Sequence, residues 1–588
     1  MKTTTPSSER ILSASVLVIG TGGAGLRAAI ELAERGVDVL GVGKRRTHDA
    51  HTTLAAGGIN AALGTMDPDD SWQQHAADTL RESYFLADPA IVETVARGAA
   101  RGIDDLARWG MPFAREDDGR ISQRFFGAHT YRRTCYAGDY TGLEIQRTLM
   151  RRAAELQVPI IDTVYITRLL VSEGRIFGAY GFDIVDGTPV VIHADAVILA
   201  AGGHTRIWRN TSSRRDENTG DSFRLAALAG GRIRDAELVQ FHPSGILEPA
   251  EAAGTLVSEA ARGEGGILRN ALGERFMERY DPERMELSTR DRVALAGYTE
   301  IIEGRGTPNG GVLLDVSHLP REQILEKLPR VYRTLIDLQM LDITEQPIEV
   351  APTAHYSMGG VWVRADDHGT GVDGLYAIGE ASSGLHGANR LGGNSLIELL
   401  VYGRITGAEA AAYVRDLTRV RRDPDAVAEA RDEVSRLLTG EPGIGSRAET
   451  PRRLQRALRD VMTEHAGVVR NEAGLLAGLA RIAELDERAA HVTAHPDIAG
   501  FDDLAHAFDL YGSLLAARAT LECALERRET RGCHNRSDYP ETHESLRGSF
   551  VWTPDAGAVF EPVPDAPESF RALAQAGADD SVEGKLVE

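Results

Sequence analysis

The strongest constraint on the fold is a glycine-rich run that directly follows an apolar strand. Residues 16–19 read VLVI, residues 20–25 read GTGGAG, and a helical pattern and a second strand follow over 26–42. This order is typical of a βαβ unit that binds a dinucleotide, because the helix N-terminus offers free N–H groups to a pyrophosphate. We therefore predict dinucleotide contacts at Gly20, Gly22 and Gly25.

Two more apolar strands end in glycine far along the chain. Residues 196–200 run into Gly202, and residues 374–378 run into Gly379 and Glu380. Parallel strands bring their carboxyl ends to one edge of a sheet, so Gly202 and Glu380 should reach the same dinucleotide. Because the three junctions span more than 350 residues, we expect a discontinuous nucleotide-binding domain.

The rest of the chain divides around these junctions. Residues 424–540 are rich in Ala, Leu, Arg and Glu at helical spacing, whereas 541–588 has scattered Pro and Asp, which predicts an extended or partly disordered segment. We expect an α/β fold with a discontinuous, doubly wound, Rossmann-like domain, an inserted α+β capping domain, a C-terminal helical domain and an extension. The nucleotide-binding domain is expected over 1–235 and 351–423, and the capping domain over 236–350. The helical domain is expected over 424–540, and the extension over 541–588.

Composition argues against several functions. The net charge of −22 disfavours a nucleic-acid-binding face, and the three cysteines, Cys135, Cys523 and Cys533, are too few to hold a four-thiolate iron–sulfur cluster. We expect no metal site in this chain. Residues 1–8 lack the apolar core of a signal peptide, and no apolar run reaches membrane-spanning length. These features predict a cytoplasmic protein that would reach a membrane only indirectly.

Five further motifs follow in order along the chain. They read QFHPSG at 240–245, SEAARGEGG at 258–266, STRDR at 288–292, HYSMGG at 355–360 and HGANRLGGNSL at 386–396. His51 precedes them, six residues before the pair Gly57 and Gly58. Together they resemble the flavoprotein subunits of succinate dehydrogenase and fumarate reductase over residues 14–415, and again at 528–534. The resemblance implies an FAD-dependent oxidoreductase that interconverts succinate and fumarate.

The same resemblance assigns the cofactor contacts. It implies FAD covalently bound through His51, with further contacts from Lys44, Gly57, Gly58, Asp221, Glu380, Asn394, Ser395 and Leu396. Other interpretations stay open, because the basic run 44–46 could bind the 2′-phosphate of NADP, Asp221 could cap a helix, and His51 could be a solvated loop histidine. The family usually has Gln or Glu where this chain has Ala56, which leaves the preferred direction of catalysis open.

A C4 dicarboxylate brings two negative charges into a dry site, where an unpaired carboxylate is very costly. By resemblance, the two carboxylates are held by His242, Ser258, His355 and Arg390, and Phe126 packs near the bond that changes. Arginine suits this task because it binds a carboxylate through two parallel hydrogen bonds. Ser258 stands where the family usually has Thr, and it retains the hydroxyl.

Proton transfer also follows from the resemblance. Arg290 would give the proton in fumarate reduction and take it back in succinate oxidation, with Glu259 and Arg262 as its relay and His242 among the catalytic residues. Arginine is an unusual acid, since its pKa lies above about 12, so the deprotonated form would be transient.

Structural interpretations compete with these roles. Arg290 could form a surface ion pair with the next residue, and Glu259 with Arg262 could be an ordinary i,i+3 helix pair. His242 could be a turn residue, and His355 and His386 could be core histidines.

Two rival functions remain. L-Aspartate oxidase shares the fold, Arg290 and the HGANR motif, but that family has no histidine at the place of His51 and usually has Ala-Ser at Gly392-Gly393. A non-catalytic flavoprotein scaffold is disfavoured because the catalytic arginines and histidines are retained. The resemblance implies a C4 dicarboxylate substrate, an iron–sulfur protein subunit as partner and, as a further option, a membrane-anchor subunit. It implies that these partners hold the protein at the inner face of the cell membrane. The electron acceptor stays open and is a quinone, a thiol disulfide or a soluble molecule.

Overall fold

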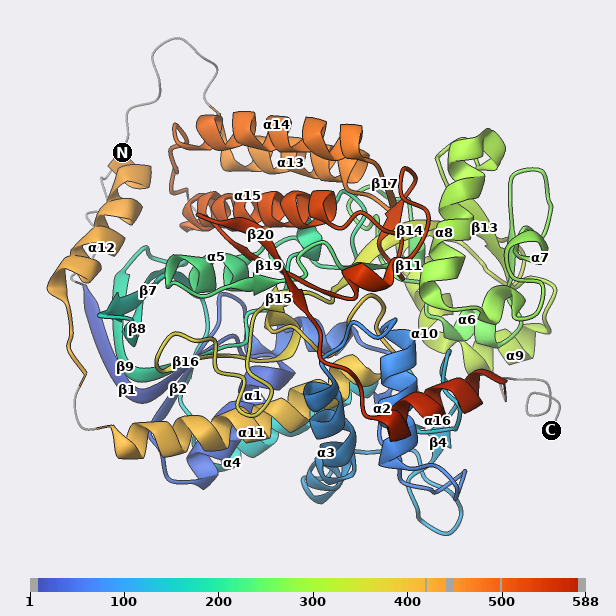
Figure 1. Cartoon of the computed structure of the whole chain (residues 1–588), viewed down its shortest axis with the longest axis horizontal. Helices are drawn as coiled ribbons and strands as arrows, with labels where there is room; N and C mark the ends of the chain where they lie inside the picture. Colours follow the sequence, from blue (N-terminus) through green and yellow to red (C-terminus); the bar gives the residue numbers. More distant parts are fainter. Residues whose placement is uncertain (1–8, 418–419, 440–448, 498–499, 580–588) are drawn as a thin grey trace.

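The computed structural model describes residues 9–417, 420–439, 449–497 and 500–579. Residues 1–8, where we expect no signal peptide, and 580–588 of the expected extension lie outside the described residues. A large sheet, a capping unit and a group of long helices surround a common centre (Figure 1). No helix within the described ranges combines the length and apolarity that crossing a bilayer requires.

The central sheet has the strand order β6-β2-β1-β9-β8-β7. These strands are Ile160–Ile161, Val39–Val42, Arg10–Ile19, Pro189–Leu199, Arg175–Asp183 and Val164–Ser172. β16 (Leu375–Ala377) pairs parallel with the end of β9, and β8 pairs antiparallel with the beginning of β9. The carboxyl ends of β1, β9 and β16 therefore meet at one edge, as the three glycine junctions predict.

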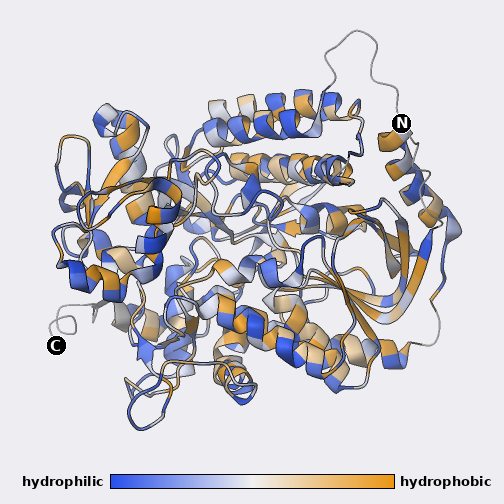
Figure 2. Ribbon diagram, turned by 180° about the vertical axis from the view of Figure 1, so that it is seen from behind, coloured by the Kyte–Doolittle hydropathy of each residue, from blue (hydrophilic) through white to orange (hydrophobic). Residues whose placement is uncertain are grey.

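Helices cover both faces of this sheet. α1 (Gly23–Glu34) and α11 (Asn394–Asp416) pack together on one face, near α3 (Pro89–Arg108) and α4 (Thr141–Glu155), and α5 (Asp221–Leu228) lies on the other (Figure 1). Strands that are buried on both faces read as continuous apolar runs, which explains the patterns at 16–19 and 196–200. Figure 2 shows these strands in orange, whereas the outer helices alternate between polar and apolar residues.

The capping unit is an α+β insertion with the sheet order β11-β14-β13-β12. Its strands are Val239–Ile246, Ile348–Ser357, Val312–Asp315 and Ile267–Arg269, and its helices are α6 (Ala260–Gly263), α7 (Met277–Tyr280), α8 (Arg290–Glu300), α9 (Arg321–Lys327) and α10 (Pro329–Gln339). It has a hydrophobic core of its own. β14 crosses the expected boundary at 350, and the domain boundaries stay predictions.

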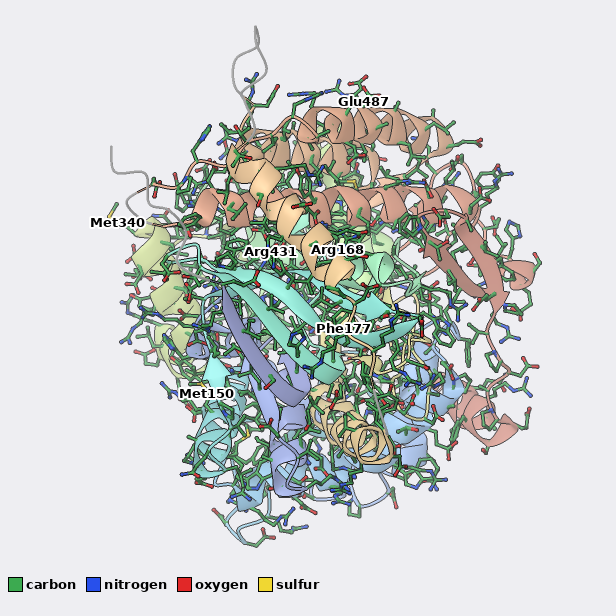
Figure 3. All side chains as sticks on the ribbon, turned by 90° about the vertical axis from the view of Figure 1, so that its left-hand side faces the viewer. Met150, Arg168, Phe177, Met340, Arg431 and Glu487 are labelled. Atoms are coloured by element: carbon green, nitrogen blue, oxygen red, sulfur yellow. The ribbon has the colours of Figure 1, made fainter. Side chains whose placement is uncertain are left out.

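The helices between residues 424 and 540 form a bundle, except for α12. α13 (Pro451–His465), α14 (Glu472–Ala489) and α15 (Asp502–Glu526) pack side by side (Figure 1). α12 (Pro424–Thr439) instead lies across β7, where Arg168 comes within 3.7 Å of Glu429 and 3.8 Å of Glu433 (Figure 3). This architecture confirms the predicted fold class.

The prediction of an extended or partly disordered C-terminal segment was wrong for the described residues. β19 (Gly548–Thr553) and β20 (Gly557–Pro562) form a hairpin, and α16 (Glu568–Asp579) packs against α2 (Trp72–Glu82). β19 also pairs with β10 (Ile233–Arg234), which continues to β15 (Gly360–Val361). The apolar side chains Phe550 and Trp552 are buried by other segments, and that burial outweighs the weak local pattern.

A buried ionic cluster joins the helical region to the nucleotide-binding domain. Arg527 is fully buried, and it donates to Glu237 at 2.6 Å, Asp235 at 3.2 Å and Glu529 at 3.3 Å. It also donates to Gly548 O at 3.0 Å, so one side chain connects three segments, at 235–237, 527–529 and 548.

Replacing Arg527 with methionine should lower the free energy of unfolding by about 3–5 kcal/mol, because three buried carboxylates lose their shared cation. Thermal unfolding followed by circular dichroism measures this effect. Arg528→Met is the matched control, since Arg528 is the exposed neighbour. Equal unfolding midpoints for the two variants would contradict the assignment of Arg527 as the anchor.

Candidate active site

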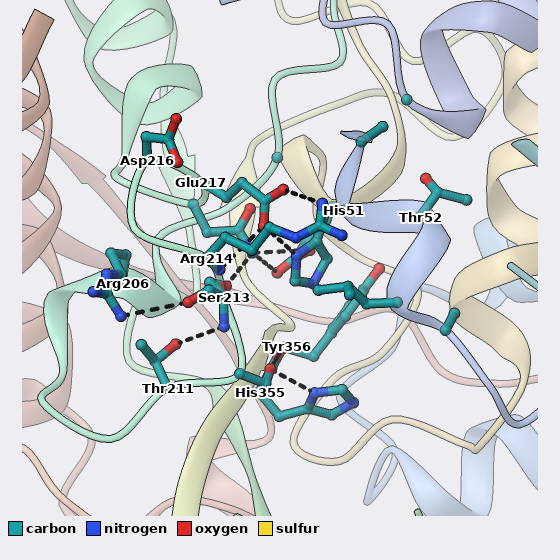
Figure 4. A pocket seen from close by; sticks show the side chains of 18 of the residues that line it. His51, Thr52, Arg206, Thr211, Ser213, Arg214, Asp216, Glu217, His355 and Tyr356 are labelled. Carbon is teal, nitrogen blue, oxygen red and sulfur yellow. Dashed lines mark hydrogen bonds and ion pairs between the residues drawn. The ribbon is translucent and has the colours of Figure 1, made fainter. Parts of the chain in front are cut away.

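One large cavity lies where the central sheet meets the capping sheet. Its volume is about 1100 Å³, and residues at the ends of β1, β9 and β16 line it together with the loop at 50–58. Figure 4 shows part of this lining, including His51, Glu217 and His355. Most predicted site residues line it: Gly20, Gly22, Lys44, His51, Gly57, Gly58, Phe126, Gly202, Asp221, His242, Ser258, Glu259, Arg290, His355, Glu380, Arg390, Ser395 and Leu396. Gly25, Arg262 and Asn394 lie behind this lining.

The glycine-rich run shapes the first part of the cavity. Gly20 has φ +104°, and a Cβ there would lie 2.2 Å from Ala200 O, so a side chain would push the two strand ends apart. A Cβ at Gly25 would lie 1.9 Å from Gly20 O. The first turn of α1 lines the cavity, and Gly22 supplies no side-chain cap. This glycine cradle at a helix N-terminus fits a dinucleotide pyrophosphate.

Lys44 lies between two carboxylates rather than in a free basic patch. Its Nζ is 2.7 Å from Asp221 and 2.9 Å from Asp509 of α15. Burial alone would lower the pKa of Lys44, but the two carboxylates raise it above its ordinary value. They also disfavour a 2′-phosphate here, which argues against NADP. Asp221 is the first residue of α5, and Gly220 rather than Asp221 occupies the N-cap.

His51 belongs to the loop that leads to the glycine pair at 57–58, and it is the histidine of this loop that is nearest to the pair in sequence. Its Nδ1 is 2.9 Å from Glu217 Oε2 (Figure 4). Burial lowers the pKa of His51, but the Glu217 carboxylate outweighs this effect and raises it. His51 is therefore a partnered side chain, with 28% of its surface still exposed.

Glu380 approaches the cavity from the end of β16. It accepts hydrogen bonds from Ser357 N at 3.0 Å and from the Asn218 amide at 3.3 Å. Asn218 Oδ1 in turn accepts from Gly203 N at 3.1 Å, which ties the ends of β9 and β16 together beside Gly202.

Phe126 is held between two glycines. A Cβ at Gly57 would lie 2.5 Å from its ring, and a Cβ at Gly392 would lie 2.2 Å from it. Only glycine leaves room for the ring at these positions. The guanidinium of Arg290 lies 5.4 Å from the ring centroid, so the ring packs against a cation at the cavity wall.

Asn394 has a supporting position. It is fully buried, and its Oδ1 accepts from Asn60 at 2.8 Å and lies 2.8 Å from His75 Nε2. Asn394 therefore holds the beginning of α11 in place, while Ser395 and Leu396 of the same turn line the cavity.

His242 and His355 face each other from paired strands. Gln240 pairs with Tyr356 and Phe241 with Ala354, which leaves His355 as an extra residue on β14. Such a β-bulge re-aims a side chain, and the two imidazole centroids lie 5.5 Å apart. Burial, followed by Arg290 for His242 and Arg390 for His355, holds both pKa values well below their ordinary range. Both rings are therefore neutral near neutral pH.

Gln240 joins the two arginines of the site. Its Oε1 accepts from Arg290 at 3.3 Å and from Arg390 at 3.0 Å. Arg390 also donates to Ser395 Oγ at 3.0 Å, and its buried Nε has no hydrogen-bond partner. Burial, then the nearby Arg290, lowers the pKa of Arg390 to about 10. Two converging guanidiniums with an unused donor suit an anionic ligand.

Glu259 completes the arginine group. Its Oε2 accepts from Arg290 Nε at 2.8 Å and lies 3.8 Å from Arg262. Burial would raise the pKa of Glu259, but Arg290 and Arg262 lower it to about 2, so the carboxylate stays ionised. Ser258 lines the cavity while its Oγ accepts from Ala260 N at 3.3 Å.

His386 is a core histidine. Its Nε2 lies 3.1 Å from the buried Glu398, and its ring packs edge-on against Tyr356 at 5.1 Å. The alternative that Arg290 forms a surface ion pair with Asp291 does not hold, because Asp291 instead accepts from Tyr84 at 2.7 Å and Asn389 at 3.0 Å.

Comparison with known proteins places this geometry in a family. The chain matches the family model for the FAD binding domain over residues 15–396 and the model for the fumarate reductase flavoprotein C-terminal region over 455–558. It is 42% identical over 539 residues to a subunit of the fumarate reductase (CoM/CoB) of Methanothermobacter marburgensis, covering 91% of this chain and 96% of that protein. It is 36% identical to the succinate dehydrogenase flavoprotein subunit of Rickettsia bellii, covering 93% and 95%.

The chain belongs to the succinate dehydrogenase/fumarate reductase flavoprotein family. Its structure is also similar to that of Mycobacterium smegmatis Sdh1 in complex with UQ1, with a TM-score of 0.87, 39% identity and 96% of each chain covered. Membership in this family makes the chain an FAD-binding oxidoreductase and confirms the resemblance read from the five motifs. L-Aspartate oxidase is not favoured.

Sequence reasoning missed two residues of this flavoprotein site. Gln240 lies two positions before His242 on β11, so strand alternation could have placed both side chains on one face. Glu217 carried no such signal, because it is 166 residues from His51 in the chain and only the fold brings them together.

Proposed function

We propose that this chain is the catalytic flavoprotein subunit that interconverts succinate and fumarate. The observation that carries the proposal is the convergence of Arg290 and Arg390 on Gln240, beside two neutral histidines and the ionised Glu259. A C4 dicarboxylate needs several donors around two carboxylates and one group that moves a proton. FAD, when bound, supplies the hydride acceptor or donor at N5.

Substrate binding falls to the arginine, the histidines and the serine. Arg390 has an unused Nε, so it can add a bond to a substrate carboxylate without losing Ser395 or Gln240. His242, His355 and Ser258 supply neutral donors to the carboxylates. Phe126 packs against the carbon chain and helps to exclude water, which strengthens the electrostatic interactions inside the site.

Arg290 moves the proton in this proposal. Glu259 and Gln240 hold its Nε and one terminal nitrogen, which fixes the direction of the guanidinium. In succinate oxidation the ionised Glu259 would accept the proton from Arg290. In fumarate reduction it would first take up a proton from the Arg262 side and then pass it to the deprotonated Arg290. Arg262 lies on the other side of Glu259 and continues the relay away from the cavity.

FAD is bound covalently through His51 in this proposal. Bonding the isoalloxazine to an imidazole raises the flavin potential, and succinate is a poor reductant that needs a high-potential acceptor. Ala56 lies beside the glycine pair that lines this part of the cavity. The direction favoured by the enzyme therefore depends on how far His51 alone raises the potential.

Electrons leave through a partner iron–sulfur subunit in this proposal. The relative from Methanothermobacter marburgensis is named as one subunit of its enzyme, and the cysteines of this chain are separate, buried and free. The assembly would lie at the inner face of the membrane through the partner and an anchor subunit. The names of similar proteins mention CoM/CoB and UQ1, so a thiol disulfide and a quinone are the first acceptors to test.

The direct test is dye-linked succinate oxidation and fumarate reduction by the purified full-length protein. We expect both reactions, with no oxidation of L-aspartate by oxygen. Activity on L-aspartate with none on succinate would replace the proposal with the oxidase. Bound FAD with neither activity would support the non-catalytic scaffold.

Replacing His51 with alanine should abolish covalent flavin. The protein is denatured in acid and run on an unstained gel under ultraviolet light. We expect a fluorescent band for the wild type and for His48→Ala, whose side chain in the same loop is 58% exposed, and a dark band for His51→Ala. A dark wild-type band with FAD in the supernatant would refute covalent attachment.

A further inference from the structure

Glu217 is a buried carboxylate whose contact with His51 no catalytic step yet uses. It lies in the loop between η3 (Thr205–Ile207) and α5, and its side chain is only 7% exposed. Its Oε2 lies 2.9 Å from His51 Nδ1 (Figure 4). The carboxylate and the imidazole thus meet from two segments that the sheet brings together.

Glu217 is itself held in place. It accepts from Arg214 N at 3.1 Å and from the Arg214 guanidinium at 3.2 Å, and Arg45 Nε lies 3.7 Å away. Burial would raise the pKa of Glu217, but the His51 and arginine contacts lower it to about 2. An ionised carboxylate can only accept hydrogen bonds. His51 must therefore carry its proton on Nδ1, and the neutral ring presents a lone pair at Nε2.

We propose that Glu217 is a positioning residue for flavin attachment, which orients His51 and prepares its Nε2 to bond the flavin. This inference rests on the proposed covalent attachment. A carboxylate that fixes the tautomer of a histidine also stabilises the positive charge that develops when the other nitrogen reacts. Without that partner, the Nε2–H tautomer would compete and would have no lone pair for the new bond.

The attachment step balances with a dicarboxylate as oxidant. A bond forms between His51 Nε2 and the 8α carbon of the flavin, one C–H bond at that carbon breaks, and the imidazole gives up its N–H proton. The electron pair of the C–H bond stays on the isoalloxazine, which becomes reduced. Fumarate then takes the two electrons and two protons and leaves as succinate, which restores the oxidised, covalently bound flavin.

The pH dependence of attachment separates orientation from general structural support. Burial and Arg214 lower the pKa of His51, whereas Glu217 and the more distant Glu380 raise it. Arg45, Arg206 and His355 are further charged or titratable groups near this pair. Attachment requires neutral His51, so its rate rises as pH passes the pKa. Removing the carboxylate charge lowers that pKa, and the rising limb should move to lower pH.

The experiment measures attachment directly. Full-length protein from riboflavin-limited cells is mixed with FAD and fumarate, and samples are quenched in acid at intervals. Band fluorescence and intact mass give the covalent fraction, and filtration before quenching gives total bound FAD. Glu217→Gln is compared with the wild type and with Asp216→Asn, a matched control whose carboxylate is 39% exposed and pairs with Arg45.

We expect Glu217→Gln to bind FAD but to attach it roughly 10²-fold more slowly, with the pH profile shifted downward, while Asp216→Asn behaves as the wild type. If Glu217→Gln attaches FAD at the wild-type rate and with the wild-type pH profile, the positioning role of Glu217 is overturned, whereas covalent attachment itself still stands. Absence of attachment in the wild type would overturn covalent binding itself. If Glu217→Gln no longer binds FAD, the Glu217→Asp variant is tested instead. Slower attachment with an unshifted pH profile in Glu217→Asp supports the positioning role. Loss of FAD binding in Glu217→Asp as well refutes that role.

Discussion

Replacing Arg290 with glutamine should lower kcat for succinate oxidation and fumarate reduction by about 10³-fold. A positioned acid or base contributes roughly 10²–10⁴-fold, and glutamine can keep a hydrogen bond to Glu259 but cannot transfer a proton. Because Arg390 and the two histidines remain, KM should change far less than kcat. That split distinguishes a lost proton donor from a lost binding group.

The control for this variant is Arg292→Gln on the same helix, α8. The Arg292 side chain is 62% exposed and reaches Asp281 only at 3.6 Å, so its loss should leave both rates unchanged. The FAD content of each variant shows whether the site is intact. Retention of more than a tenth of the wild-type kcat by Arg290→Gln, with full FAD content, would sink the proposed proton role.

Replacing Arg390 with methionine should weaken binding of succinate and fumarate by roughly 10²–10³-fold. Removing one partner of a buried charge pair costs about 2–5 kcal/mol, and each 1.4 kcal/mol is a factor of about ten in affinity. Isothermal titration of the flavin-loaded protein with fumarate measures the change. Arg364→Met is the control, because that arginine is about half exposed and pairs with Asp367.

The same variant should not lower the thermal stability of the ligand-free protein. Burial and the like charge of Arg290 lower the pKa of Arg390 to about 10. The charged guanidinium therefore destabilises the ligand-free protein. Methionine removes the charge from that site. A protein that binds fumarate as tightly as the wild type after this change would refute the carboxylate-binding role, whereas a lower unfolding midpoint would indicate a structural role instead.

The local sequence carried the prediction of the nucleotide-binding fold. Gly20 and Gly25 occur where any side chain would strike a neighbouring backbone oxygen, so the requirement is visible as a residue type in a fixed order. The same holds for the motif residues around His242, Arg290 and Arg390, which supported the family assignment before any contact was known. Their individual roles stay predictions.

Local patterns failed where distant segments decide the conformation. The hairpin β19–β20 is held by pairing with β10 and by burial of Phe550 and Trp552. α12 resembles the bundle helices in composition, yet it packs on β7. Neither outcome is encoded in a short window, because the stabilising surface belongs to residues far away in the chain.

The sequence by itself determined the βαβ start, the discontinuous nucleotide domain and the family of the chain, because these depend on apolar periodicity and on glycines that short-range sterics demand. Only the tertiary structure decided the partners of the reactive groups. It placed Glu217 on His51, Asp509 on Lys44, and Gln240 between Arg290 and Arg390. The protonation state and the orientation of a titratable side chain depend on neighbours within a few ångströms. In the folded chain these neighbours come from positions up to 465 residues apart.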